Sequence, residues 1–138
     1  MQNKEYIAIV QCHLVKQRCS GYFCEKAFHE RSGGFANFAK DKQYRKLNMT
    51  CGGCSGRALN RKLNNLIRKL KAKEDISKDK IIVQLSSCIT KDNFHGPPCP
   101  HLNYLKEIIK KNGLDYQEDT RISKLSEKRR QEGIYNSK

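Results

Sequence analysis

The chain has 138 residues and a mass of 16.0 kDa, a size that fits one domain with one hydrophobic core. Hydrophobic residues make up 37% of it and charged residues 30%, a balance that excludes a disordered or fibrous protein. The net charge of +14 predicts attraction to anionic partners, although a general lysine bias would explain it equally well.

The sequence shows neither a secretory signal nor a membrane span. The apolar run at residues 6–10 is short and no small-residue cleavage site follows it. No run approaches the roughly 20 apolar residues that a transmembrane helix needs. We therefore expect a cytoplasmic protein without membrane contact. Thiols stay reduced in that compartment, so seven cysteines, an odd number with close pairs, predict metal, cluster or redox chemistry rather than disulfides.

Three β-rich segments each lead into a cysteine. Residues 6–10 (Tyr-Ile-Ala-Ile-Val) form a continuous apolar run, typical of a buried parallel strand, and Cys12 follows them. Residues 44–50 predict a weaker strand nearer a sheet edge, followed by Cys51. Residues 81–85 predict a third strand, which ends in Ser86-Ser87-Cys88. Residues 114–120 predict a short fourth strand.

Helical segments separate these strands. A short helix is expected over residues 25–30, and a long one over residues 56–72 with Ser55 as its cap. A third helix is expected after Pro100, which suits the first helical position, and Asn112-Gly113 would end it. Three phenylalanines are expected in the core rather than in a binding surface: Phe28, Phe35 and Phe38.

The alternation of strands and helices predicts an α/β fold. We expect a single three-layer domain over residues 1–120 with a mostly parallel four-stranded sheet in the flavodoxin-like or Rossmann-like order 2-1-3-4. Residues 121–138 are expected to form a basic polar tail. Ligands of such sheets bind at the carboxyl ends of the strands, beside the switch point. Cys12 and Cys88 should lie there, with Cys51 one strand away.

These cysteines predict a thiol site. Cys51 and Cys54 have a spacing at which two thiolates can hold one metal, and the glycines between them let the turn bring both sulfurs inward. Together with Cys88 and Cys99 they form a tetrahedral set, and soft sulfur favours zinc or an iron–sulfur cluster. A second set of ligands or an outer shell is expected from Cys12, Cys19, Cys24 and His101.

Two other functions compete with metal binding. Cys54 precedes a helix whose positive end would lower a thiol pKa, so Cys51 and Cys54 could instead form the dithiol of a redox enzyme or sensor. The sequence does not indicate whether the protein is an enzyme or which oligomeric state it adopts. The long helix also predicts a face for an anionic partner such as nucleic acid, unless it is merely solvated. Its cations are Arg57, Arg61, Lys62, Arg68, Lys69, Lys71 and Lys73.

The combined motifs resemble those of the small prokaryotic CGGC-domain proteins. The resemblance rests on Cys51-Gly-Gly-Cys54 after one strand, Ser86-Ser-Cys88 after another, and Pro98-Cys99-Pro-His101 before a helix, and it extends over residues 5–120. It implies a metal-binding domain, with zinc as the expected metal. The motif thiols then fall on all seven cysteines, with His101 as the motif histidine. The basic helix and the tail depart from the usual pattern.

Overall fold

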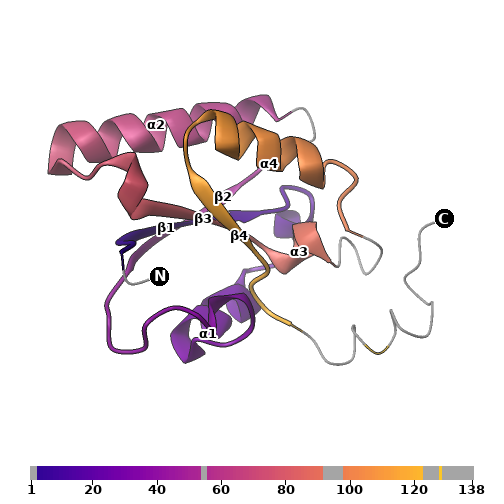
Figure 1. The fold of residues 1–138 in the computed structure, drawn as a ribbon. Coiled ribbons are helices and arrows are strands. Elements are labelled where there is room, and N and C mark those ends of the chain that lie inside the picture. Colours follow the sequence, from indigo (N-terminus) through magenta and orange to yellow (C-terminus); the bar gives the residue numbers. More distant parts are fainter. Residues whose placement is uncertain (1–2, 54–55, 92–97, 123–127, 129–138) are drawn as a thin grey trace.

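The computed structural model describes residues 3–53, 56–91, 98–122 and 128. Its centre is a parallel sheet of four strands in the order β2-β1-β3-β4 (Figure 1). The strands are β1 (Tyr6–Gln11), β2 (Arg45–Thr50), β3 (Ile81–Leu85) and β4 (Asp115–Glu118). This order confirms the predicted α/β fold with strand order 2-1-3-4.

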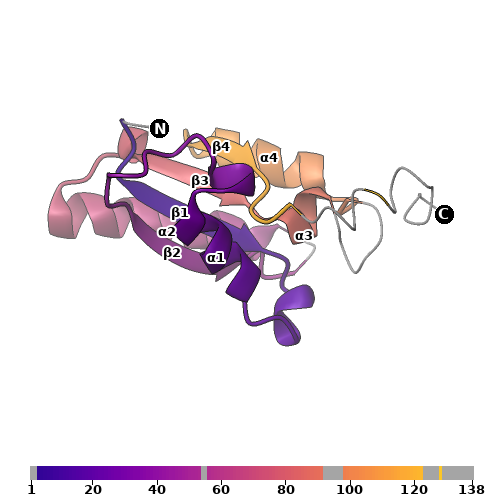
Figure 2. The ribbon, with the colours of Figure 1, turned by 90° about the horizontal axis from the view of Figure 1, so that it is seen from below.

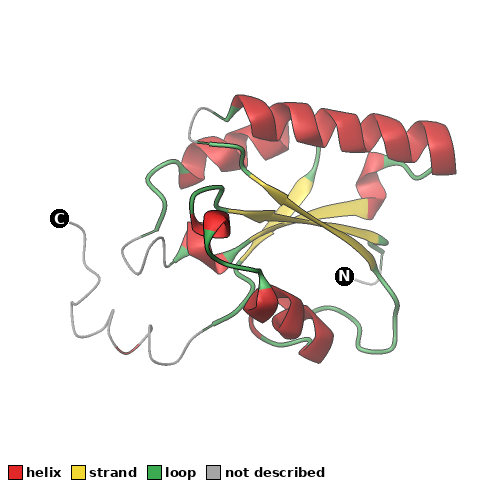
Figure 3. Cartoon of the chain, turned by 180° about the vertical axis from the view of Figure 1, so that it is seen from behind, coloured by secondary structure: helices red, strands yellow, loops and turns green. Residues whose placement is uncertain are grey.

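Helices cover both faces of the sheet. The helices α2 (Arg57–Glu74) and α4 (Leu102–Lys111) lie on one face, and α1 (Tyr22–Glu30) lies on the other (Figures 1 and 3). The short helix α3 (Ser87–Thr90) follows β3. Three 3-10 turns complete the described elements: η1 (Val15–Gln17), η2 (Gly33–Phe35) and η3 (Lys78–Lys80). Seen from below, α1 lies in front of the sheet, and α2 and α4 lie behind it (Figure 2).

The two central strands explain why the sheet forms a core on each side. β1 and β3 are buried along their whole length, as expected of parallel strands covered on both faces. The face beneath α2 and α4 contains aliphatic side chains, including Leu59, Leu63 and Leu105. The opposite face is partly aromatic, and its rings pack edge to face at centroid distances of 5.2–6.4 Å. These rings belong to Phe28, Phe35, Phe38 and Tyr44, which confirms the core position predicted for the three phenylalanines.

Several boundaries differ from the prediction. α2 begins at Arg57, and Gly56 at φ 78° takes the N-cap position expected of Ser55, which lies outside the described residues. A Cβ on Gly56 would lie 2.6 Å from the Ile108 side chain, so close helix packing explains the glycine. α4 begins at Leu102 with His101 at its N-cap; Pro100 at the first helical position was therefore wrong. α3 was not expected, because four residues carry too little periodicity.

The chain beyond β4 crosses the carboxyl end of β3. Thr120 is fully buried, and its carbonyl accepts a hydrogen bond from Gly34 N at 2.9 Å. The buried amide of Gln84 donates to the carbonyls of Gly34 (3.0 Å) and Asp119 (2.6 Å). This polar network joins β3, η2 and the end of β4. Most of the predicted tail, residues 123–127 and 129–138, lies outside the described residues. Among the described helices, none combines the length and apolar character that crossing a membrane requires.

Candidate thiol site

The strand ends place cysteines along one edge of the sheet. Cys12 follows β1, Cys51 follows β2, and Cys88 lies in α3 directly after β3. Backbone contacts hold these positions, because Cys51 N donates to Gln11 O at 3.0 Å and Cys12 N donates to Cys88 Sγ at 3.2 Å. The carboxyl edge of the sheet therefore brings the backbone of Cys12 into direct contact with the sulfur of Cys88.

A pocket of about 150 Å³ opens beside Cys12. Three thiols line it, from the ends of β1 and β2 and from the loop before α4, although these segments are far apart in sequence. Cys12 and Cys51 are only 7% and 8% exposed. Cys99 is positioned by α3, because its amide donates to Ile89 O at 2.8 Å. The full lining is Cys12, His13, Leu14, Cys51, Gly53, Ile89, Cys99, Pro100, His101 and Leu105.

The turn after β2 depends on glycine and is tied to its neighbours. Gly52 has φ 73°, and a Cβ there would lie 2.2 Å from Ala58 Cβ in α2. The turn can therefore pass close to the helix only without a side chain at this position. Just before it, Thr50 accepts hydrogen bonds from Lys62 Nζ at its carbonyl (3.0 Å) and hydroxyl (3.1 Å). Its hydroxyl also lies 3.2 Å from His13 Nδ1. α2 thus holds the turn and places a cation beside it.

A second group of polar side chains surrounds Cys88 and Cys24. Cys88 Sγ donates to Ser86 Oγ at 3.3 Å, and Cys24 Sγ lies 3.4 Å from the same hydroxyl and 3.2 Å from Thr120 Oγ1. Burial raises the pKa of Cys88 from 9.0 to about 11, and the hydrogen bonds of its sulfur with Ser86 and the Cys12 amide offset this only in part. Burial therefore favours the neutral thiol of Cys88.

Sequence reasoning missed two members of this second group. Ser86 stood within the recognised Ser86-Ser87-Cys88 motif, so its position beside a cysteine gave a usable signal. Thr120 gave none, because a lone threonine in a polar segment has no periodicity or motif. Its hydroxyl nevertheless receives the Ser87 amide at 3.3 Å, and its own amide donates to Ser87 Oγ at 2.9 Å.

The remaining predicted site residues are dispersed. Cys19 is exposed between η1 and α1, and His101 is exposed at the rim of the thiol pocket. Cys24 lies in α1, away from the pocket lining, and Cys54 lies outside the described residues. Among the described residues, no group of three or more His, Cys, Asp and Glu side chains is arranged to hold a metal. The seven described residues of the expected site are thus divided among a pocket, a neighbouring hydroxyl cluster and an exposed cysteine.

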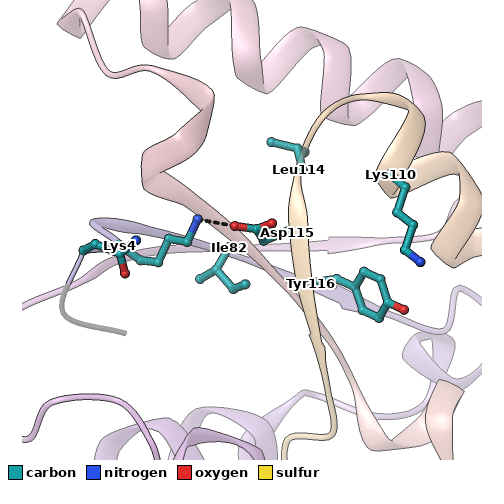
Figure 4. A pocket seen from close by; sticks show the side chains of 7 residues that line it. Lys4, Ile82, Lys110, Leu114, Asp115 and Tyr116 are labelled. Carbon is teal, nitrogen blue, oxygen red and sulfur yellow. Dashed lines mark hydrogen bonds and ion pairs between the residues drawn. The ribbon is translucent and has the colours of Figure 1, made fainter.

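A larger hollow lies at the opposite, amino end of the strands (Figure 4). Its volume is about 520 Å³, and the buried Lys4 reaches across it to Asp115 at 2.7 Å. Lys110 of α4 and Tyr116 of β4 line one side of it. No thiol or imidazole is among its described lining residues. Although this hollow is larger than the thiol pocket, its lining residues do not make it a candidate thiol or metal site.

The fold and the site define a cysteine-rich α/β domain with flavodoxin-like strand order and a thiol pocket at the carboxyl edge of its sheet. A family model described as the CGGC domain matches residues 6–120, and the chain belongs to this family. The match confirms the resemblance drawn from the cysteine motifs. Comparisons with curated proteins and with solved structures found no match.

Proposed function

We propose that this protein is a metal-binding domain that holds zinc in the thiol pocket through Cys12, Cys51, Cys99 and His101. One observation carries the proposal: three distant segments each contribute a thiol to the same small pocket, and a histidine stands at its rim. Scattered packing cysteines would not be expected to share a pocket. Cys88 lies outside this set, and its sulfur accepts a hydrogen bond from the Cys12 amide at 3.2 Å.

The donor set fits zinc by its chemistry. Three sulfurs and one imidazole nitrogen form a closed tetrahedral set of the kind found in structural zinc sites. An iron–sulfur cluster is the alternative, because soft thiolates also favour it. The ligands are not in coordination positions in the described residues. Metal binding therefore requires side-chain rotation, for which the exposed His101 and the glycine turn leave room. A reducing cytoplasm would keep the thiols available.

Metal content after anaerobic purification tests the proposal. We expect about one equivalent of zinc by mass spectrometry, and an intense sulfur-to-metal charge-transfer band once cobalt replaces zinc. An iron–sulfur cluster would give a coloured protein with iron and sulfide instead. Less than about half an equivalent of any transition metal, unchanged after reconstitution, would exclude metal binding as the function.

Matched cysteine variants locate the metal. Cys51→Ser and Cys99→Ser should each lower zinc affinity by at least about tenfold and weaken the cobalt band. Cys19→Ser is the control, because Cys19 is exposed and absent from the pocket lining. If Cys19→Ser lowers the affinity as much as Cys51→Ser, the proposed ligand set is wrong. A metal-free protein in which mild oxidation joins Cys51 to Cys54 would support the redox function instead.

A further inference from the structure

We propose that the edge of β2 and the adjoining side of α2 form a docking groove for an acidic peptide segment, which adds to the sheet as a fifth strand. We define this β2–α2 groove by the residues that line it: Leu47, Met49, Arg61, Lys62, Asn65 and Arg68. The groove is separate from the thiol pocket in its lining, and its function does not depend on metal binding.

The backbone of β2 offers an open pairing edge. β2 is the terminal strand of the described sheet, and its parallel partner β1 lies on one side only. Arg45 N donates to Glu5 O (3.1 Å) and Cys51 N donates to Gln11 O (3.0 Å). The backbone amides and carbonyls of the odd-numbered residues of β2 therefore point toward β1. Because hydrogen-bonding direction alternates along a strand, the amides and carbonyls of Lys46 and Asn48 point outward. An exposed edge of this kind is a template for strand addition.

Lys62 marks the end of this open edge. Thr50 is the next residue whose backbone faces outward, and its carbonyl already accepts a hydrogen bond from Lys62 Nζ at 3.0 Å. The pairing positions are thus limited to the first part of β2. A short extended segment of another chain matches this length better than a long strand does.

The groove combines an apolar floor with cationic walls. Leu47 is 38% exposed although it lies on the same face of the sheet as the core residue Ala8, its register partner. Met49 continues this floor, while Arg61 and Arg68 stand exposed on the neighbouring helix. The groove has a volume of about 520 Å³. Every second residue of an added strand shares one face, so acidic and apolar residues placed two positions apart would both face the groove and match this pattern.

Charge and chemistry select the occupant. A second copy of the chain carries +14 and would be repelled. The polar segment from Arg121 onward has six positive and two negative charges, so it does not supply an acidic strand. Single-stranded nucleic acid is usually bound on aromatic stacking platforms, and no aromatic ring is among the described lining residues of the groove. A peptide with carboxylates and aliphatic side chains matches both the walls and the floor.

Fluorescence anisotropy with a labelled Glu-Thr-Val-Thr-Glu-Thr peptide tests the proposal, because its glutamates and its valine share one face of an extended strand. We expect saturable binding to the full chain that weakens as salt is raised. The double variant Arg61→Glu/Arg68→Glu should weaken it by about tenfold or more. Lys26→Glu/Lys111→Glu makes the same change in net charge at exposed positions outside the groove and should bind nearly as well as the unmodified chain. Circular dichroism checks that both variants fold.

Three outcomes would overturn the proposal. Equal losses in the two double variants would mean that only net charge attracts the peptide. Undiminished binding of the same peptide with every backbone amide N-methylated would exclude strand addition, because such a peptide cannot donate to the edge. Tighter binding of a labelled oligothymidylate, abolished by Arg61→Glu/Arg68→Glu, would assign the groove to nucleic acid. Zinc content of these variants is read in parallel, so failure here is distinguishable from failure at the thiol pocket.

Discussion

The backbone amide of Cys12 donates a hydrogen bond to the sulfur of Cys88 at 3.2 Å. This contact joins the carboxyl ends of the two central strands, where a flavodoxin-like sheet has its switch point. The sulfur of Cys88 also donates to Ser86 Oγ at 3.3 Å, and that hydroxyl lies 3.4 Å from Thr120 Oγ1. The contact between Cys12 and Cys88 therefore connects the thiol pocket to the hydroxyl cluster of Ser86 and Thr120.

We expect Cys88 to alkylate far more slowly than the exposed Cys19 in metal-free, reduced protein. Burial raises its pKa to about 11 from an ordinary 9.0, which lowers its thiolate fraction at about pH 8 by about a hundredfold. Iodoacetamide labelling followed by peptide mass spectrometry measures this, with the exposed Cys19 as the internal reference. The difference should vanish in concentrated urea. Labelling of Cys88 in the folded protein as fast as Cys19 would contradict the raised pKa.

Thr120→Val should destabilise the domain by about 1–3 kcal/mol. The valine keeps the shape but removes the hydroxyl that lies within hydrogen-bonding distance of Cys24 Sγ (3.2 Å), Ser86 Oγ (3.4 Å) and Ser87 N (3.3 Å). The free energy of unfolding in urea measures the loss. Thr120→Ser is the control, because it retains the hydroxyl and should cost less. Equal stability of Thr120→Val and the unmodified chain would show that the network contributes nothing.

Gly52→Ala should destabilise the domain by about 2–4 kcal/mol, from backbone strain and steric overlap together. The backbone has φ 73°, and the new Cβ would lie 2.2 Å from Ala58 Cβ. Urea denaturation of Gly52→Ala, Ala58→Gly and the double variant measures the coupling between the two sites. The double variant should be more stable than the sum of the single effects predicts. Strict additivity would mean that the two positions do not touch.

The ion pair between Arg45 and Glu74 should make stability depend on acid pH. The hydrogen bond from Arg45 holds the pKa of Glu74 below its ordinary 4.5. A carboxyl whose pKa is lower in the folded than in the unfolded state stabilises the protein fully at a pH above its unfolded-state pKa. This contribution is lost as the pH falls through its folded-state pKa. Both side chains are exposed, so the effect should be small and weakened by salt.

Glu74→Gln tests this pH dependence. Its Tm should be lower than that of the unmodified chain at about pH 6, and the difference should shrink as the pH falls below 4.5 and through the lower pKa of Glu74 in the folded state. Glu25→Gln, at an exposed site on α1, makes the same charge change without Arg45. A Tm difference that does not shrink at all as the pH is lowered would rule out the ion pair as its cause.

Much of the fold could be predicted because its signals are local. The apolar runs of β1 and β3, and the apolar residues at helical spacing in α2, are recognisable from short stretches of sequence. The parallel order followed from alternation and the handedness of crossovers. α3 and the end of α2 at Glu74 escaped prediction, because helix ends depend on capping contacts and packing.

The sequence by itself determined that cysteines meet at one edge of a sheet. The carboxyl ends of parallel strands coincide whatever the side chains do, so Cys12, Cys51 and Cys88 had to share that edge. Only the tertiary structure decided how the thiols divide. Cys99 is brought to Cys12 and Cys51 by a loop anchored on α3, whereas Cys24 turns to the hydroxyls of Ser86 and Thr120. The direction of a side chain, and the loop that returns to meet it, depend on packing between distant segments, which no local pattern encodes.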